Sequence, residues 1–469
     1  MLVGGSVRAA AEDAAAGGYR VTALDHFGDA DLLAVTDSWQ RITSGIDWTR
    51  LIDRFPGPIV PTGGFAWPTD RPAIPPQVDN RRADRLIAFP TQNVYADLCQ
   101  PTILGELALA AGIDFPITLP VDSRQNRSIS DPENWLVKPL GGTGGSGIER
   151  LSVRLAAADR PENSDPSVIQ RWVPGRVIGV NYFARFRSGV RQIRRLGVFA
   201  GLTERRNRSQ RWLYGGSLGP FPAAISPRIT PSAWAALERL GELIADRFSL
   251  VGLFNVDLIL RPDGSLCLLE INPRYSASME LLRPPLRNGP DQVHEQTGPL
   301  SLIDWHLAAY QELAGAIETA AADRRTAWST GESLPDLAPA GMACKRIVYA
   351  TRPLRVDRTA AELTTIITPW LDELVATDSA GKQRLATAAG RPIQLSFHDL
   401  PVIGRSVTPE ELTATDELET LGQRPLTSEI VPVGRPVLTI ILRGNVSANT
   451  LLKWSRHIDQ RLNSLLALS

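Results

Sequence analysis

Apolar and polar residues alternate along two neighbouring stretches of the chain, residues 253–260 and 266–272. A period of two is typical of a β-strand that buries one face, because successive side chains point to opposite sides. The two stretches flank Pro262-Asp263-Gly264, a turn signal in which Pro fixes φ and Gly accepts a positive φ. The pattern therefore predicts a β-hairpin.

The register of this hairpin gathers polar side chains on one face. A two-residue turn at Asp263-Gly264 and a four-residue turn around it give the same register, which pairs Asp257 with Glu270 and Asn255 with Asn272. The opposite face is predicted to be apolar and to carry Val256, Leu258, Leu260, Cys267, Leu269 and Ile271.

Two carboxylates in cross-strand register repel each other, by about 4 kcal/mol at ~4 Å with an effective dielectric constant of about 20. A cation is therefore expected between Asp257 and Glu270, and hard oxygen ligands with room for phosphate oxygens suit Mg²⁺ better than Zn²⁺. The alternative is a hairpin whose polar face is simply solvated. Because Asn272-Pro273-Arg274 follows directly and presents a positive charge beside the acids, we favour a metal and phosphate site.

A second motif lies more than a hundred residues earlier in the chain. Residues 134–139 form a predicted strand that carries Lys138, one of only four lysines, and five of the seven residues 141–147 are glycine. Glycines let backbone N–H groups approach phosphate closely, although a plain flexible loop is the alternative interpretation. Ile148-Glu149-Arg150 replaces the Lys-Ser/Thr of a Walker A loop, so a different phosphate-binding loop is expected, with Lys138 as a point charge.

Strand and helix patterns fill the rest of the chain. A strand at 1–3, a glycine turn, a helix at 8–18 and a strand at 19–24 predict a βαβ start, but GxGxxG is missing and NAD binding is not favoured. Further helices are predicted at 101–113, 231–247, 302–321 and 449–465.

Three shorter segments carry expectations about exposure and specificity. Residues 177–186 predict a strand, and its Arg185 and the following Arg187 are expected at the protein surface. Residues 276–282 have a helical pattern, and 283–299 predict a loop that borders a substrate cleft.

Length and composition narrow the classes of function. At 469 residues, the chain is expected to form about three domains. Lys+Arg and Asp+Glu balance at 50 each, so no nucleic-acid footprint is evident and the expected partners are small molecules. No apolar run approaches the ~20 residues that span a bilayer, so we expect a cytoplasmic protein without a membrane partner. The three cysteines and five histidines lack disulfide or metal-ligand spacing and are expected to be structural.

The lysine strand, the glycine loop and the hairpin ending in Glu-x-Asn-Pro-Arg together resemble the ATP-grasp superfamily over residues 101–283, most specifically in LLEINPRYSASMEL. The segments GGSVRAAAEDAAAGGYRVTALDHFGDAD, WLYGGSLGP and PVGRPVLTIILRGN also resemble one ATP-grasp subfamily. That subfamily is linked to one-carbon (methanofuran and tetrahydromethanopterin) metabolism and is similar to tyramine-glutamate ligase.

This resemblance implies an α/β (α+β ATP-grasp) fold in four parts. They are a Rossmann-like pre-ATP-grasp domain at 1–98, an ATP-grasp N-terminal subdomain with the glycine-rich loop at 99–175, a C-terminal subdomain with the metal site at 176–325, and a small C-terminal α+β domain at 326–469.

The resemblance also implies roles for single residues. Lys138 would contact ATP on its α-phosphate and adenine side, and Arg274 would stabilise the transferring phosphoryl group. Mg²⁺, or Mn²⁺ in its place, would bind to Asp257, Glu270 and Asn272. The nucleotide would further contact the glycine loop (Gly142, Thr143, Gly144, Gly145, Ser146, Gly147) and an adenine pocket (Gln170, Arg171, Trp172, Val173).

The implied activity is that of an ADP-forming ligase, in which a carboxylate attacks the γ-phosphate of ATP and an amine traps the acyl phosphate. Its partners would be a small-molecule carboxylate and amine, and a homodimer is left open. A carboxylase or kinase on the same scaffold and a non-catalytic ATP-binding regulator are the alternatives. Two departures from the family pattern weaken the match: Cys99-Gln100-Pro101 lacks the usual basic residue, and Gln170-Arg171-Trp172 lacks the usual acid.

Overall fold

The computed structural model describes most of the residues of the chain. These are 1–42, 55–64, 86–121, 128–140, 142–156, 166–187, 190–203, 211–221, 229–282, 301–318, 341–356, 358–377, 393–399, 430–431, 436–444 and 446–467. The predicted cleft loop at 283–299 and the first loop glycine, Gly141, lie outside the described residues.

A four-stranded parallel sheet opens the chain, in the order β3-β2-β1-β4. Helix α1 follows β1 through a glycine turn and β2 comes next, so the predicted βαβ start is confirmed. Because the strands are parallel, the turns after β1 and β4 meet at one edge, where the backbone N–H of Gly5 donates to the carbonyl of Gly63 at 2.6 Å. The elements are β1 (Leu2–Val3), α1 (Arg8–Ala16), β2 (Thr22–Asp25), α2 (Ala30–Val35), β3 (Ser38–Arg41) and β4 (Val60–Pro61).

A second four-stranded sheet is antiparallel, in the order β5-β8-β6-β7. It carries Lys138 on β6 and Gln170 on the neighbouring β8. Its elements are β5 (Thr118–Pro120), η1 (Pro132–Asn134), β6 (Trp135–Pro139), β7 (Glu149–Arg150), α7 (Leu151–Ala156) and β8 (Ser167–Arg171).

An eight-stranded sheet forms the body of the molecule, in the order β13-β12-β9-β10-β11-β14-β18-β16. Its strands are β9 (Arg176–Arg187), β10 (Val190–Thr203), β11 (Tyr214–Gly219), β12 (Gly252–Leu260), β13 (Leu266–Asn272), β14 (Met342–Tyr349), β16 (Ile393–His398) and β18 (Pro436–Gly444). The β11–β14 pairing continues the sheet across the predicted boundary at residue 326, so the four-domain division stays a prediction.

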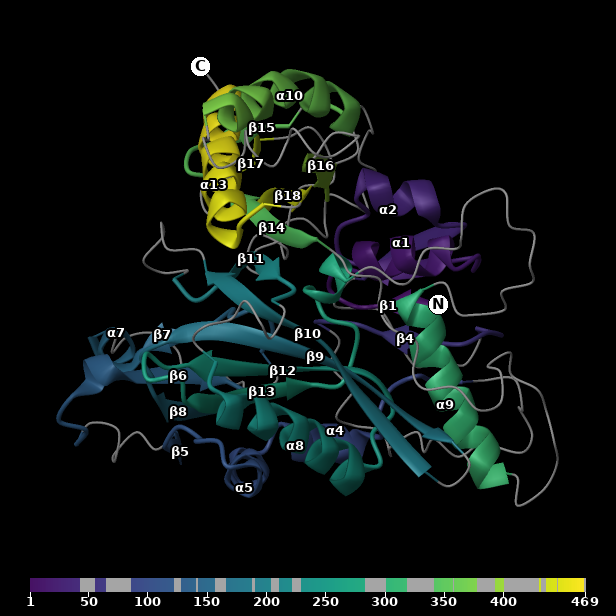
Figure 1. Cartoon of the computed structure of the whole chain (residues 1–469), viewed down its shortest axis with the longest axis vertical. Helices are drawn as coiled ribbons and strands as arrows, with labels where there is room; N and C mark the ends of the chain where they lie inside the picture. The colour runs from purple at the N-terminus through teal and green to yellow at the C-terminus, as the bar shows by residue number, and fades with distance from the viewer. Residues whose placement is uncertain are drawn as a thin grey trace.

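Helices cover this sheet on both faces (Figure 1). On one face, α5 and α8 pack on the apolar side of β9, β12 and β13, and α4 lies beside them. On the other face, α9 packs against β9 and β12 and also contacts α1. The described helices here are α4 (Gln92–Leu98), α5 (Pro101–Ala111), α8 (Pro231–Phe248) and α9 (Leu302–Glu318).

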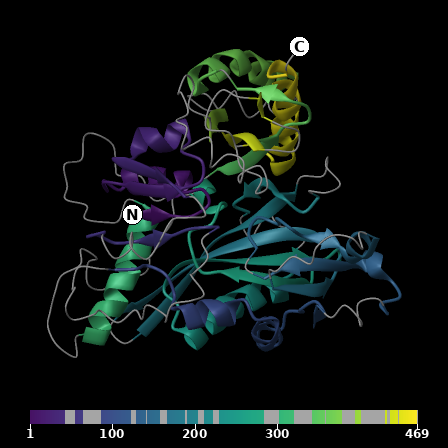
Figure 2. The same ribbon diagram turned by 180° about the vertical axis from the view of Figure 1, so that it is seen from behind.

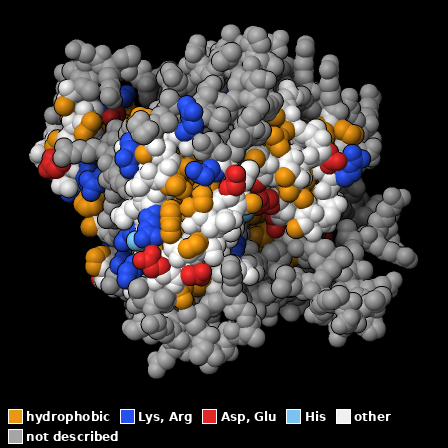
Figure 3. All heavy atoms as spheres, turned by 90° about the horizontal axis from the view of Figure 1, so that it is seen from above, with side chains coloured by type: hydrophobic (Ala, Val, Ile, Leu, Met, Phe, Trp, Pro, Cys, Tyr) orange, Lys and Arg blue, Asp and Glu red, His pale blue; other side chains and the backbone are white. Residues whose placement is uncertain are grey.

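The last part of the chain packs two helices on β14, β16 and β18 and lies beside the N-terminal sheet, as the reverse view also shows (Figure 2). It contains β15 (Leu354–Arg355), α10 (Ala360–Thr377), β17 (Ile430–Val431) and α13 (Ala448–Leu465). On the face seen from above, described side chains of both charges are interspersed with apolar ones (Figure 3). Among the described helices, none is long and apolar enough to cross a membrane.

The hairpin register is confirmed where it matters for the acids, since Asp257 pairs with Glu270 and Asn255 with Asn272. Beyond Asp257 the register shifts by one residue, because Leu258 pairs with Leu268. This bulge reverses the predicted faces of the distal strand: Leu266 and Leu268, in place of Cys267 and Leu269, join the core of Val256, Leu258 and Leu260.

Two other expectations are wrong. Arg185 is only 1 % exposed, because it lies on β9, against which α9 packs, and its Nε donates to Gln192 Oε1 on the paired β10 at 2.7 Å. Residues 276–282 contain only the single 3₁₀ turn η4 (Met279–Leu281). The hydroxyl groups of Ser276 and Ser278 bond to the Asn181 side chain, which holds the segment against β9 in place of a helix.

His306 on α9 fixes the start of β12. The Leu253 N–H donates to its Nδ1 at 2.8 Å, and its Nε2 lies 2.9 Å from the Ala88 carbonyl, so a neutral ring protonated on Nε2 satisfies both contacts. Gly252 has a φ of +80°, and a Cβ there would lie 2.4 Å from His306 Nδ1. Burial lowers the pKa of His306 to about 4.

We predict that this histidine makes the fold acid-sensitive. Between the ordinary pKa of 6.5 and the native pKa of about 4, the unfolded chain binds a proton that the native protein does not. Stability should therefore fall as the pH falls through this window, by up to about 3 kcal/mol from this group. Denaturant titrations at several pH values should show a shallower dependence for His306→Gln, and an identical dependence in both proteins would contradict the prediction.

Candidate active site

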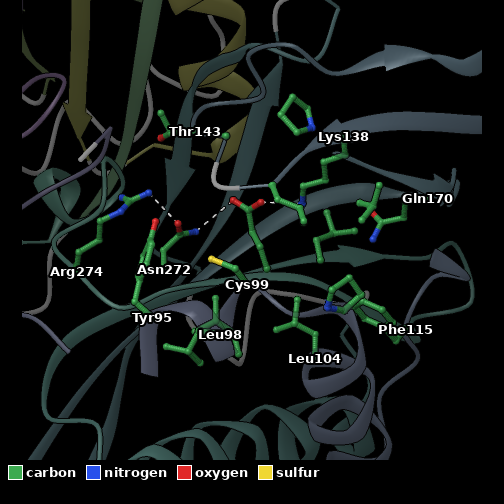
Figure 4. A pocket seen from close by; sticks show the side chains of 18 of the residues that line it. Tyr95, Leu98, Cys99, Leu104, Phe115, Lys138, Thr143, Gln170, Asn272 and Arg274 are labelled. Atoms are coloured by element: carbon green, nitrogen blue, oxygen red, sulfur yellow. Dashed lines mark hydrogen bonds and ion pairs between the residues drawn. The ribbon is translucent and has the colours of Figure 1, made fainter. Parts of the chain in front are cut away.

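The paired acids of the hairpin lie at the centre of a polar cluster. Asn272 Nδ2 donates to Asp257 Oδ2 at 3.1 Å and to Glu270 Oε1 at 3.3 Å. Lys138 Nζ reaches across from β6 and forms an ion pair with Glu270 Oε2 at 2.8 Å (Figure 4). The positive charge expected beside the two carboxylates is therefore supplied by the lysine of the other sheet.

The two carboxylates titrate in opposite directions. Burial alone would raise the pKa of Glu270, but the Lys138 ammonium outweighs it and lowers this pKa to about 2. Burial, together with the negative charge of Glu270, raises the pKa of Asp257 well above its usual range. One ammonium thus compensates one carboxylate, and a second cation is needed before both acids ionise readily.

The donor set fits a divalent cation that prefers oxygen. Asp257 and Glu270 offer carboxylate oxygens, and Asn272 offers an amide oxygen that now accepts from Arg274 Nη2 at 2.7 Å. A half-turn of the Asn272 amide would bring its oxygen to the side of the acids. These three residues are the ones that could hold Mg²⁺.

A pocket opens beside this cluster, between the hairpin and the smaller antiparallel sheet (Figure 4). Its polar wall comes from the hairpin side and from β6 and β8, through Glu270, Asn272, Arg274, Lys138 and Gln170. Its apolar wall includes Leu98, Leu104, Phe115, Val168 and Ile271. A site with one polar and one apolar wall suits a ligand that has both a charged and a flat apolar part.

The glycine loop lines the pocket only at its start. Gly142 and Thr143 face the cavity, whereas the Gly144 carbonyl accepts from the Tyr214 N–H at 2.9 Å. A Cβ on Gly145 would lie 2.0 Å from the Trp212 carbonyl oxygen. The loop is therefore fastened to the segment that leads into β11.

Of the segment predicted to bind adenine, residues 170–173, only the first residue lines the pocket. Gln170 lines the pocket, and its Nε2 donates to Thr118 Oγ1 at 3.1 Å. Arg171 pairs with Asp131 at 2.6 Å, and Trp172 lies under the guanidinium of Arg150 at 4.7 Å. The roles predicted for Gly144 to Gly147 and for residues 171–173 stay predictions, since these residues do not line the described pocket.

Sequence reasoning missed two titratable pocket residues, which lie on and directly after the helix α4. Tyr95 on α4 and Cys99 at its C-terminal end lie four residues apart, so they face the same way. Burial raises the pKa of both side chains. The i, i+4 spacing was visible in the sequence, but nothing in it indicated that this side of α4 faces the acids.

The N-terminal sheet also reaches the site. A Cβ on Gly63 would lie 3.1 Å from Arg274 Nη1, so the turn after β4 approaches the guanidinium closely. Gly64 lines the pocket, and a Cβ on it would lie 3.8 Å from Thr143. Arg274 is thus placed between the carboxylate hairpin and the edge of the parallel sheet.

An N-terminal parallel sheet followed by antiparallel sheets that face each other across a lysine, a glycine loop and a carboxylate hairpin defines an ATP-grasp fold. Residues 108–278 match the model of the ATP-grasp domain family. The chain therefore has the ATP-grasp fold, and residues 108–278 form its ATP-grasp domain.

Solved structures share this fold over almost the whole chain. N5-carboxyaminoimidazole synthetase from Staphylococcus aureus, complexed with ADP, is 14% identical, with a TM-score of 0.55 over 98% of this chain and 96% of that one. The N5-carboxyaminoimidazole ribonucleotide synthetase from Thermus thermophilus is 15% identical, with a TM-score of 0.52 over 100% of this chain and 98% of that one.

A biotin carboxylase domain is also similar. The one of the Hydrogenobacter thermophilus 2-oxoglutarate carboxylase, in complex with MgADP, ADP and bicarbonate, is 13% identical, with a TM-score of 0.54 over 95% of this chain and 86% of that one. At these identities the likeness shows the fold alone. The comparison with curated proteins finds no match.

Two neighbouring glycines allow a matched test of the glycine loop. Both Gly144 and Gly145 have a positive φ, +62° and +77°, so alanine strains the backbone at either position. Only at Gly145 does the added Cβ also meet the Trp212 carbonyl. We expect Gly145→Ala to weaken MgADP binding at least about tenfold more than Gly144→Ala, which corresponds to about 1.4 kcal/mol. Equal affinities of the two variants in calorimetric titrations would contradict this.

Proposed function

We propose that the protein is an ATP-dependent carboxylate-amine ligase that forms an amide or peptide-like bond through an acyl phosphate. The observation that carries the proposal is the convergence of Lys138, the start of the glycine loop, the Asp257/Glu270/Asn272 cluster and Arg274 at one pocket between two sheets. The apolar wall of that pocket suits the adenine ring, and its polar wall suits the phosphates.

In this proposal the residues act by position and charge. Lys138 leaves Glu270 and contacts the α-phosphate of ATP, and the N–H groups of Gly142 and Thr143 cover the β- and γ-phosphates. Mg²⁺ on Asp257, Glu270 and Asn272 would neutralise charge on the phosphate oxygens. Arg274 contacts the transferring phosphoryl group.

The acceptor would bind between Arg274 and the glycine turns of the N-terminal sheet. A carboxylate oxygen attacks the γ-phosphorus, the bond to the ADP oxygen breaks, and an acyl phosphate forms. The amine nitrogen then attacks the acyl carbon, phosphate leaves, and the amine loses a proton. The close approach of Gly63 to Arg274, where a Cβ would lie 3.1 Å from Nη1, supports this location because it brings the glycine turns next to the guanidinium.

The particular substrates are a further part of the proposal. The sequence resemblance to the subfamily of methanofuran and tetrahydromethanopterin metabolism favours an amino acid and an amine from one-carbon metabolism. No structural contact of the pocket carries that choice, so it depends on the resemblance alone.

A carboxylase is the second candidate, because similar structures include N5-carboxyaminoimidazole synthetases and a biotin carboxylase domain with bicarbonate.

Purified protein should release ADP and phosphate from ATP when a carboxylate and an amine are both supplied. Turnover that requires bicarbonate would select the carboxylase instead, and AMP as product would contradict an acyl phosphate. Binding of ATP without turnover on any substrate pair would indicate a regulator.

Substitution of single acids should show that the proposed metal site, and not the hairpin in general, is needed for turnover. We expect Glu270→Gln to lower turnover by at least about 100-fold, because it removes a metal ligand and the partner of Lys138. Asp263→Asn is the matched control, since Asp263 lies in the exposed turn of the same hairpin and bonds only locally to Ser265 in the described contacts. Phosphate release should be unchanged in the control, and a similar loss in both variants would contradict the assignment.

A further inference from the structure

A second cluster of buried charges holds the segment that follows Arg274. It consists of Glu280 in that segment and of Arg8 and Lys345. The two oxygens of the Glu280 carboxylate each bind one cation: Oε1 contacts Arg8 Nη1, and Oε2 contacts Lys345 Nζ at 2.5 Å. Arg8 belongs to α1 and Lys345 to β14, so the first and last parts of the chain meet at this carboxylate. The three side chains are between 2% and 7% exposed.

The same segment is held through its backbone as well. Arg443 on β18 donates to the carbonyls of Glu280 and Leu281 at 2.7 and 3.0 Å. Lys345 Nζ also lies 3.4 Å from the carbonyl of Ala277. The turn between Arg274 and Leu282 is therefore fastened by cations from the C-terminal strands.

Beneath the turn, the hydroxyl groups of Ser276 and Ser278 bond to Asn181 on β9 at 3.1 and 3.3 Å. Asn181 pairs in register with Asn255, and Asn255 with Asn272, so one row of asparagines runs across three strands to the polar cluster around Asp257 and Glu270. The ion pairs of Glu280 and the hydrogen bonds to Asn181 therefore hold the residues between Arg274 and Glu280 from two sides.

We propose that Glu280 is a positioning residue, which sets the placement of Arg274 and of Ser276 to Ser278 against the N-terminal glycine turns. The inference rests on the proposed function, because it assigns these residues to the acceptor side of that same site. Glu280 does not line the described pocket, so it acts through the turn that it holds.

Electrostatics favour a positioning role over a stabilising one. Arg8 also pairs with Glu12 and with Asp399, both at 3.0 Å. These two acids could neutralise the charge of Arg8 without Glu280, so charge compensation alone does not require Glu280. Buried ion pairs contribute little net stability compared with apolar packing, but they specify geometry because each donor must meet its acceptor. Burial opposes the charge of Glu280, yet Arg8 and Lys345 lower its pKa to about 2, which keeps the carboxylate ionised at neutral pH.

The test compares Glu280→Gln with Glu106→Gln. Glu106 also forms an ion pair, at 2.7 Å with Arg247, but at an exposed position on α5. In Glu280→Gln the amide must turn a donor toward Arg8 or Lys345, and the turn should loosen. Hydrogen exchange of residues 274–282 should become at least about tenfold faster. MgADP affinity should stay within about twofold, because ADP lacks the phosphoryl group that Arg274 is proposed to contact.

Where the wild-type protein turns over, kcat should fall by about 10- to 100-fold in Glu280→Gln, with the KM for ATP unchanged, since a misplacement of about 1 Å can cost that much. Glu106→Gln should match the wild type in every measurement. Hydrogen exchange and MgADP binding need no turnover, so a failure of the proposed function and a failure of this inference are distinguishable.

A second pair of variants keeps the inference testable if Glu280→Gln does not fold. Lys345→Arg retains the charge and should preserve the exchange rates of residues 274–282, whereas Lys345→Gln should raise them. Unchanged exchange in Glu280→Gln would overturn the inference, as would equal exchange in the two Lys345 variants. A parallel loss of MgADP affinity and melting temperature would also overturn it, because that result indicates a purely structural role.

Discussion

The opposition of Asp257 and Glu270 across one strand pair is the constraint on which the rest of the site depends. Two acids in this register do not both ionise readily without a cation, and the lysine that pairs with Glu270 belongs to a different sheet. Lys138 therefore links the smaller sheet to the hairpin through this ion pair. The pocket lies between the two sheets, and both partners of the ion pair line it.

The surrounding structure limits how the hairpin can move. Toward β9, the polar face of the hairpin continues through the asparagine row to Ser276 and Ser278. After β13, Arg274 bonds to Asn272 and lies close to the turn at Gly63. The parallel sheet, the antiparallel sheets and the C-terminal strands thus all contact the residues between 270 and 282. Contacts from separate parts of the chain thus hold one strand and the turn that follows it in a fixed position.

The sequence was sufficient where the determining interactions are local. The alternation of residues 253–272 and the turn at Pro262-Asp263-Gly264 predicted the pairing of the acids, and the lysine strand with its glycines predicted the opposite wall. The bulge beyond Asp257 could not be predicted, because it depends on a register shift that neither turn length implied. As a result, the faces of Cys267 and Leu269 were assigned wrongly. Long-range packing accounts for the other failures. Arg185 is buried on β9, against which α9 packs, and Tyr95 and Cys99 face the acids only because α4 packs against β13. The helical pattern of residues 276–282 gave way to contacts with Asn181, Arg8, Lys345 and Arg443, whose parent elements are scattered over the whole chain.

The Lys138–Glu270 ion pair also implies how ligands would influence each other. A nucleotide that draws Lys138 toward its phosphates leaves Glu270 uncompensated beside Asp257, which raises the affinity of the acids for a divalent cation. By the same linkage, a cation bound between the acids releases Lys138 for the nucleotide. Each ligand thus replaces the charge that the other displaces. We therefore infer that the metal and the nucleotide bind cooperatively, and that the cross-strand repulsion within the hairpin is the source of this coupling.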